Sequence, residues 1–214
     1  MDEEISIINN STRNERIKNF FINNKKKLIF SVPIILILII SYLTYAEFLI
    51  KKKLNLSNRY NESSFNFTLE NKMKVKNEMI DIVNKKDKTY SPLALYFLID
   101  NNIISSDKEI NELFDVILKI NKLDKEIKNL VIYKKGLFNS SFEDENNLIK
   151  ILNPILNSNS IWKSHALFLM GEYFLNNSEK QKANEFFEKI LVLENSNPDI
   201  KLETQKIIQR DLSE

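Results

Sequence analysis

A single long apolar run lies near the N-terminus of the chain, between two groups of three lysines. The run, LIFSVPIILILIISYLTYAEFLI, occupies residues 28–50, and the lysines occupy residues 25–27 and 51–53. As a helix rising ~1.5 Å per residue, its uncharged part (28–46) is long enough to cross a hydrocarbon layer of about 30 Å. Residues 28–50 are therefore predicted to form a transmembrane helix.

Two other interpretations of this run stay open. A cleaved signal peptide would end at the small-residue sequence Thr44-Tyr45-Ala46, but the polar stretch before the run and the run itself are longer than signal peptides normally carry. A buried helix of a soluble domain would not be expected to carry three lysines at each end, because lysine is almost never fully buried. A membrane span is the preferred interpretation.

The residues before the span, 1–27, are predicted to form a short cytoplasmic segment. They carry a small excess of basic residues over the stretch after the span, which favours a cytoplasmic N-terminus. Apolar residues recur in this segment at near-helical spacing and predict an amphipathic helix: Ile5, Ile8, Ile17, Phe20 and Phe21.

Beyond the span, apolar residues follow a helical period through the rest of the chain. In the membrane-proximal region, 51–88, they predict a helix that leaves the membrane and continues without a break to a polar stop at 84–88. Its apolar positions are Leu56, Tyr60, Phe65, Phe67, Leu69, Met73, Val75, Met79, Ile82 and Val83.

Residues 89–214 contain a series of helix-start signals, and no stretch alternates between polar and apolar residues as a strand would. The signals are Ser91-Pro92, the capping boxes at 106–109 and 178–181, Asp124, and Asn197-Pro198. With only 2 glycines and 4 prolines, the chain is poor in the residues that tight β-turns need. The prediction is an all-α fold of short antiparallel helix pairs stacked into a solenoid.

One helix pair carries a more specific pattern, with the spacing of a tetratricopeptide repeat. Gly171 and Ala183 are small residues where two helices of a hairpin would cross, so that their backbones can approach closely. The larger residues around that crossing complete the pattern: Leu167, Met170, Phe174, Phe187 and Ile190. The pattern departs from the usual repeat at Pro198, which falls three places late, and at Trp162. The prediction for 89–214 is a degenerate array with one readable repeat.

The chain as a whole resembles a bacterial family of single-span, tetratricopeptide-like inner-membrane proteins. These are ancillary subunits of the Sec translocon, close in type to periplasmic cell-division coordinator proteins. The matching features are the acidic start at 2–4, the basic stretch into the span, Tyr60, Leu148-x-x-x-Leu152-x-Pro154, the 162–166 and 171–174 segments, and Asn197-Pro198. The resemblance implies a cytoplasmic N-terminus, a periplasmic C-terminal domain, and contact with translocon subunits and periplasmic chaperones or clients. It implies no active site.

The residue types present give no support to catalysis, a metal or a cofactor. Cysteine is absent and His165 is the only histidine, so zinc ligation and nucleophile–base pairs lack their usual residues. The two glycines, Gly136 and Gly171, are too far apart for a phosphate-binding loop. The acidic run 143–145 is interpreted as a solvated helix start. A net charge of +2 does not favour nucleic acid.

The leading functional hypothesis is a membrane-tethered, non-enzymatic binding scaffold in the periplasm that accompanies the Sec translocon. The alternative is a structural or cell-division scaffold in which residues 56–83 mediate self-association. The lysines at 72–76 and 85–88 are interpreted as solvated, with contact to anionic lipid as the alternative. The sequence does not show which residues form the protein-binding groove under either hypothesis.

Overall fold

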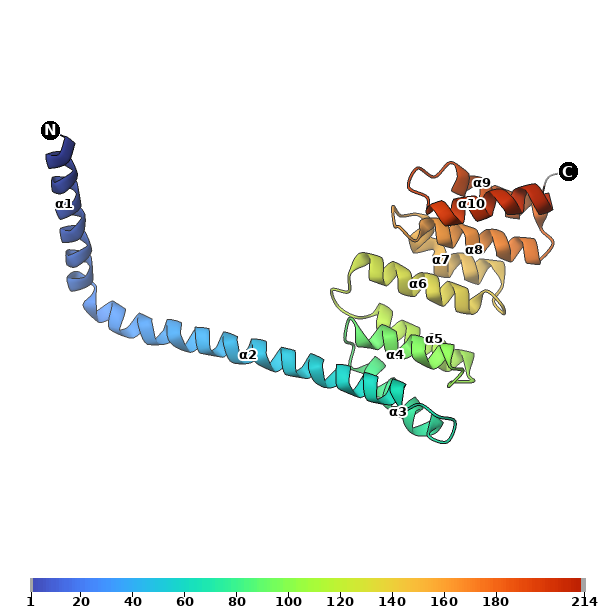
Figure 1. Cartoon of the computed structure of the whole chain (residues 1–214), viewed down its shortest axis with the longest axis horizontal. Helices are drawn as coiled ribbons and strands as arrows, with labels where there is room; N and C mark the ends of the chain where they lie inside the picture. Colours follow the sequence, from blue (N-terminus) through green and yellow to red (C-terminus); the bar gives the residue numbers. More distant parts are fainter. Residues whose placement is uncertain (1, 213–214) are drawn as a thin grey trace. The chain divides into compact units, whose positions relative to one another are not determined.

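The computed structural model describes the backbone of residues 2–212 and the side chains of residues 13–212 other than 28 and 32. Within these residues every regular element is a helix, which confirms the all-α prediction (Figure 1). The chain divides into two compact units between Asn55 and Leu56. The first unit holds the N-terminal helix and the apolar segment, and the second holds residues 56–65 of the following helix and the helices after it.

The apolar segment lies inside one continuous helix, α2 (Lys25–Phe65), which follows α1 (Asp2–Asn23). Its most apolar 18-residue window has a mean hydropathy of 2.4, and none of that window is buried within the protein. The helix is therefore long and apolar enough to cross a membrane. The Thr44 hydroxyl donates to the backbone carbonyls of Ile40 and Ser41, which satisfies its hydrogen-bonding capacity inside the helix.

The predicted amphipathic helix before the span coincides with α1. Ile17, Phe20 and Phe21 are exposed on its second half. Ile5 and Ile8, the other two apolar positions of the prediction, have side chains outside the described set.

The prediction of an unbroken helix from the membrane to Val83 is wrong. Helix α2 ends at Phe65, and α3 (Lys72–Asn84) begins after a six-residue connection. Asn71 stabilises this connection: its amide nitrogen donates to the Asn66 carbonyl at 2.6 Å, and its amide oxygen accepts from the Thr68 backbone nitrogen at 2.9 Å. Side-chain bonds of this type compete with helical ones, which periodicity alone does not register.

The second unit contains seven further helices. They are α4 (Tyr90–Asp100), α5 (Asp107–Leu118), α6 (Lys125–Asn139), α7 (Glu145–Leu156), α8 (Lys163–Asn176), α9 (Lys180–Leu191) and α10 (Pro198–Ile207), which ends in a π-helical turn, η1 (Ile208–Leu212). From α3 onward each helix packs against the next, α3 also packs against α5, and α8 against α6 and α10. Figure 1 shows α6, α8 and α10 side by side.

Three of the predicted helix starts are confirmed. Ser106, Asp124 and Asn197 are N-caps whose side chains accept backbone hydrogen bonds from the first turns of α5, α6 and α10. The capping box at 106–109 is only half formed, because the Glu109 carboxylate pairs with Lys76 of α3 at 2.9 Å. The acidic run 143–145 opens α7, with Asp144 as its N-cap.

Two predicted starts are wrong. Ser91 lies inside α4, where its buried hydroxyl donates to the Ile82 carbonyl of α3 at 2.9 Å, and Asp87 accepts from the backbone nitrogens of Thr89 and Tyr90 instead. Ser178 adopts a positive φ of 63°, and α9 begins after Glu179 without a side-chain cap. Ser91 does not cap α4 because its hydroxyl bonds to α3. Ser178 does not cap α9 because it lies in the turn that joins α8 to α9.

The apolar side chains of the second unit form two clusters. The first joins the end of α2 to α3, α4, α5 and the side of α6 that carries Val131 and Phe138. The second joins the side of α6 that carries Ile132 and Tyr133 to α7, α8, α9 and α10. A reciprocal pair of amide hydrogen bonds between Asn111 of α5 and Asn139 of α6, both 2.9 Å, links the helices where the clusters meet.

The seven predicted repeat positions on α8 and α9 are all buried, and all but Gly171 belong to the second cluster. They are Leu167, Met170, Gly171, Phe174, Ala183, Phe187 and Ile190. At the crossing of these two helices the Phe187 ring lies directly over Gly171. A Cβ placed on Gly171 would come within 2.8 Å of ring atoms of Phe187. Only a residue without a side chain lets the ring occupy this position.

We expect Gly171→Ala to lower the free energy of unfolding by about 1–3 kcal/mol, because the rigid Phe187 ring and the helix behind it must move. Gly136→Ala is the matched control: its Cβ would meet only the flexible end of Leu152, so its loss should be smaller. Denaturant unfolding of the full chain in detergent measures both. Adding Phe187→Leu should reduce the loss caused by Gly171→Ala, and equal losses for the two glycines would contradict the assignment.

Candidate binding surface

A surface formed by α4, α6 and α8 carries two adjoining cavities. Each helix contributes side chains from successive turns. Tyr96, Ile99 and Asp100 of α4 face Lys134, Leu137 and Phe138 of α6, and both sets have the i, i+3, i+4 spacing that places residues on one side of a helix.

The smaller cavity, between α4 and α6, has a volume of about 120 Å³ and apolar walls. Phe114 of α5 is fully buried and also lines the cavity, and its ring lies 6.2 Å from that of Phe138. The Tyr96 hydroxyl oxygen is buried and has no hydrogen-bond partner among the residues that the structure describes. Burial raises the pKa of Tyr96 to about 12, so the hydroxyl stays neutral near pH 7.

The larger cavity, about 440 Å³, lies between the C-terminal end of α6 and α8. Its lining combines the apolar residues Leu137, Phe142 and Leu169 with Glu172 and Tyr173 of α8. The Tyr173 hydroxyl donates to the Glu143 carbonyl at 3.3 Å, which fixes α8 to the connection before α7. Glu172 is exposed at the rim, where partial desolvation and then the charge of Glu203 raise the pKa of its carboxyl.

Leu137 belongs to the lining of both cavities and is 43% exposed. The two cavities therefore adjoin at this side chain on α6. We call the pair the Leu137 groove, defined by the lining residues Tyr96, Ile99, Asp100, Phe114, Lys134, Leu137, Phe138, Ser140, Ser141, Phe142, Glu143, Leu169, Glu172, Tyr173, Asn176 and Asn177.

An aromatic cluster joins α6 to the start of α8. The Tyr133 and Trp162 rings stack at 5.8 Å, and His165 lies 5.1 Å from Trp162 and 5.7 Å from Tyr133 between ring centroids. Burial lowers the pKa of His165, which disfavours the charged form of its ring. Beside the cluster, Glu126 of α6 accepts hydrogen bonds from the Ser160 hydroxyl and the Ile161 backbone. These contacts hold α6 and α8 side by side and thereby set the width of the groove.

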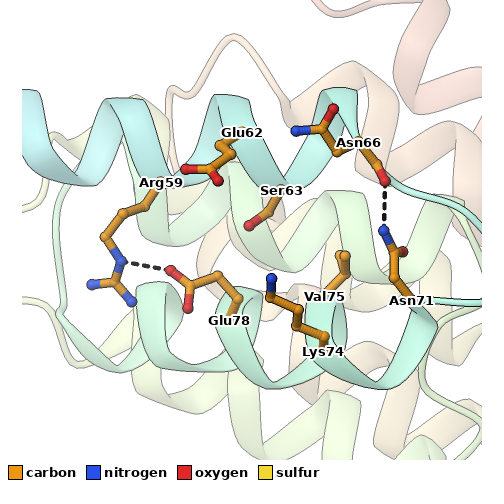
Figure 2. Close-up of a pocket in the computed structure, with 8 residues that line it drawn as sticks. All are labelled: Arg59, Glu62, Ser63, Asn66, Asn71, Lys74, Val75 and Glu78. Carbon is orange, nitrogen blue, oxygen red and sulfur yellow. Dashed lines mark hydrogen bonds and ion pairs between the residues drawn. The ribbon is translucent and has the colours of Figure 1, made fainter.

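A third cavity, of about 240 Å³, lies between the end of α2 and α3 (Figure 2). Several of its polar side chains form hydrogen bonds between α2, α3 and the connection that joins them. Arg59 donates to Glu78 at 2.5 Å and to Asp81 at 2.7 Å, and Asn71 donates to Asn66. Hydrogen bonds to both carboxylates raise the pKa of Arg59, and the bond from Arg59 lowers the pKa of Asp81. The bonds of Arg59 to Glu78 and Asp81 clamp the end of α2 to α3.

The groove was not located by the sequence patterns. The seven repeat positions are buried on α8 and α9, and none of them lines the groove. A weak signal was available at Leu137, which falls off the buried stripe of α6, and at Phe142 in the connection after it; both are large, apolar and exposed. In the described part of the chain, no three His, Cys, Asp or Glu side chains gather closely enough to hold a metal ion.

Comparison with known proteins adds no identification. No protein-family model, no curated protein and no solved structure matches this chain.

We expect Arg59→Ala to lower the free energy of unfolding by about 1–2 kcal/mol, because two carboxylates lose a partly buried hydrogen-bonding partner. Lys108→Ala is the control, since the Lys108–Glu112 pair is highly exposed at 4.0 Å and its loss should change stability by only a few tenths of a kcal/mol. Thermal unfolding of the full chain in detergent measures both.

The Arg59 contribution should also depend on pH. The pKa of Asp81 is lowered from 3.8 in the folded state, so this stabilisation is complete above that ordinary value and is lost as the pH falls through the folded-state pKa. The stability difference between the wild type and Arg59→Ala should therefore be constant near neutrality and shrink below pH ~4. A difference that stays unchanged in acid would contradict the ion-pair assignment.

Proposed function

We propose that this protein is a membrane-tethered binding scaffold that holds an extended polypeptide segment in the Leu137 groove. The observation that carries the proposal is the meeting of two partly apolar cavities at Leu137, across three neighbouring helices. Binding sites for peptides on helical arrays are grooves of this kind, in which apolar side chains enter pockets and polar groups at the rim fix the register.

The tether supports the same proposal. Helix α2 continues from the apolar segment to Phe65, so the second unit is covalently linked to that segment. If the apolar segment is anchored in a membrane, this link raises the effective concentration of the groove beside a membrane partner. We propose that the second unit is a degenerate tetratricopeptide-like array in the periplasm of a bacterium, and that it accompanies the Sec translocon and receives periplasmic clients or chaperones.

Photo-crosslinking in cells tests the contact with a client polypeptide and the contact with the translocon separately. A photoreactive residue at Leu137 should trap a polypeptide in transit, whereas one at Glu185, exposed on α9, should not. A photoreactive residue at Lys53 should trap a translocon subunit. Recovery of only lipid or of a second copy from Lys53, together with equal yields from Leu137 and Glu185, would overturn the proposal.

The orientation of the chain in the membrane can be tested separately. With the N-terminus in the cytoplasm, protease added to spheroplasts should digest residues 56–214 and leave a fragment that contains the apolar segment. Complete protection of the C-terminal unit in intact spheroplasts, with digestion after lysis, would place it in the cytoplasm and refute the periplasmic assignment.

A specific observation favours the second candidate function, a self-associating envelope scaffold. Phe65, Leu69 and Met73, around the connection between α2 and α3, are 87%, 84% and 69% exposed. Exposed apolar groups of this kind mark contact sites. Native mass measurement of the full chain in lipid nanodiscs distinguishes the two. A dimer that Leu69→Lys converts to a monomer supports self-association, and a monomeric wild type excludes it.

A further inference from the structure

The second half of α1 carries an exposed apolar stripe. Ile17, Phe20 and Phe21 have the i, i+3, i+4 spacing that places residues on one side of a helix. All three are exposed, and the Phe20 and Phe21 rings meet edge to face with centroids 6.0 Å apart. Ile22 is also exposed but lies outside the stripe. Exposed apolar groups gathered on one side of a helix mark a contact site.

Basic side chains flank this stripe. At about 100° per residue, Arg16 and Lys18 each lie roughly a quarter of a turn from its centre, one on either side. Residues 13–27 hold six basic residues and one acidic residue, Glu15, which lies on the opposite side of α1 from the stripe. All seven charged side chains are exposed. An apolar stripe flanked by cations is typical of helices that lie in the headgroup layer of an anionic bilayer.

A turn at Asn24 separates α1 from α2. The backbone nitrogen and the side-chain amide nitrogen of Asn24 both donate to the Phe20 carbonyl, at 3.0 and 2.9 Å. Side-chain bonds of this kind compete with the continuation of a helix, and α1 ends at Asn23. Because α1 is a separate helix, its stripe can face a bilayer surface that α2 crosses.

The position of the stripe in the chain identifies what covers it. The apolar segment begins at residue 28, only eight residues after Phe20. At a rise of ~1.5 Å per residue, helical backbone places Phe20 within about 12 Å of that residue. This distance is comparable with the Debye length of about 8–10 Å at physiological ionic strength. When α2 crosses a bilayer, the headgroup layer therefore lies beside the stripe and within reach of its flanking cations.

We propose that the second half of α1 binds the surface of an anionic bilayer. Ile17, Phe20 and Phe21 enter the boundary between headgroups and acyl chains, and Arg16 and Lys18 contact lipid phosphates. This inference rests on the membrane tether of the proposed function and adds a second contact with the same bilayer. With the N-terminus in the cytoplasm, the surface is that of the cytoplasmic leaflet, which carries anionic lipid.

The absence of cysteine from the chain permits a test with single spin labels on the full-length protein. Ile17→Cys and Phe21→Cys place the label on the stripe. Asn19→Cys, on the other side of α1, is the matched control, and Leu38→Cys reports on the apolar segment. Single copies are reconstituted in nanodiscs of phosphatidylcholine, with or without phosphatidylglycerol. Paramagnetic resonance then measures the access of each label to oxygen, which dissolves in lipid, and to a water-soluble nickel chelate.

In discs that contain phosphatidylglycerol, the labels at positions 17 and 21 should be open to oxygen and shielded from the chelate, and the label at 19 should show the reverse. Arg16→Gln and Lys18→Gln each remove one flanking cation. Each should lower the ratio of lipid-facing to water-facing label at position 21 by about fivefold, the factor that one cation near an anionic surface contributes. In phosphatidylcholine alone the same changes should leave the ratio nearly unaltered.

The label at position 38 separates this proposal from the tether on which it rests. Water-facing labels at 17 and 21 with a lipid-facing label at 38 would overturn the proposal and leave the tether intact. A water-facing label at 38 would refute both. Equal lipid exposure at 17, 19 and 21 would also overturn the proposal. Shielding that appears only in discs holding two copies would do the same, because it would assign the stripe to self-association.

Discussion

The burial of one apolar stripe from each short helix against its neighbours is the interaction on which the second unit depends. Helices α3 to α10 are 10–15 residues long, and isolated helices of that length are marginal in water. Each is held by contacts with the helices before and after it, and in several cases with the next but one. Close approach at Gly171 and the amide pair Asn111–Asn139 fix how these helices meet.

The Leu137 groove is a consequence of this packing. Helix α6 buries one side against α5 and α7 and presents Lys134 and Leu137 outward. Phe114 packs between α4 and α6. The Tyr133–Trp162–His165 cluster joins α6 to the start of α8. The connection after α6 contributes residues 140–143 to the groove, and the rest of the lining comes from the helices themselves.

Prediction from sequence was accurate where a residue acts on its own neighbours in the chain. Asp124 and Asn197 cap helices because their carboxylate and amide oxygens reach backbone nitrogens two and three residues ahead. It was wrong at Ser91, whose hydroxyl bonds to α3, and across 66–71, where Asn71 bonds to Asn66 and Thr68 and ends the helix. Phe65, Leu69 and Met73 continued the apolar period, yet they are exposed.

By itself the sequence determined that the chain is helical and that one segment is apolar and long enough to cross a membrane, because helical period and hydropathy are properties of neighbouring residues. Which apolar residues stay outside the core was decided by tertiary structure. Tyr96 and Leu137 lie 41 positions apart in the chain and line one cavity only because α5 folds back and brings α4 and α6 to face each other. A local sequence pattern cannot predict that Tyr96 and Leu137 lie close together, because their proximity depends on how three helices pack.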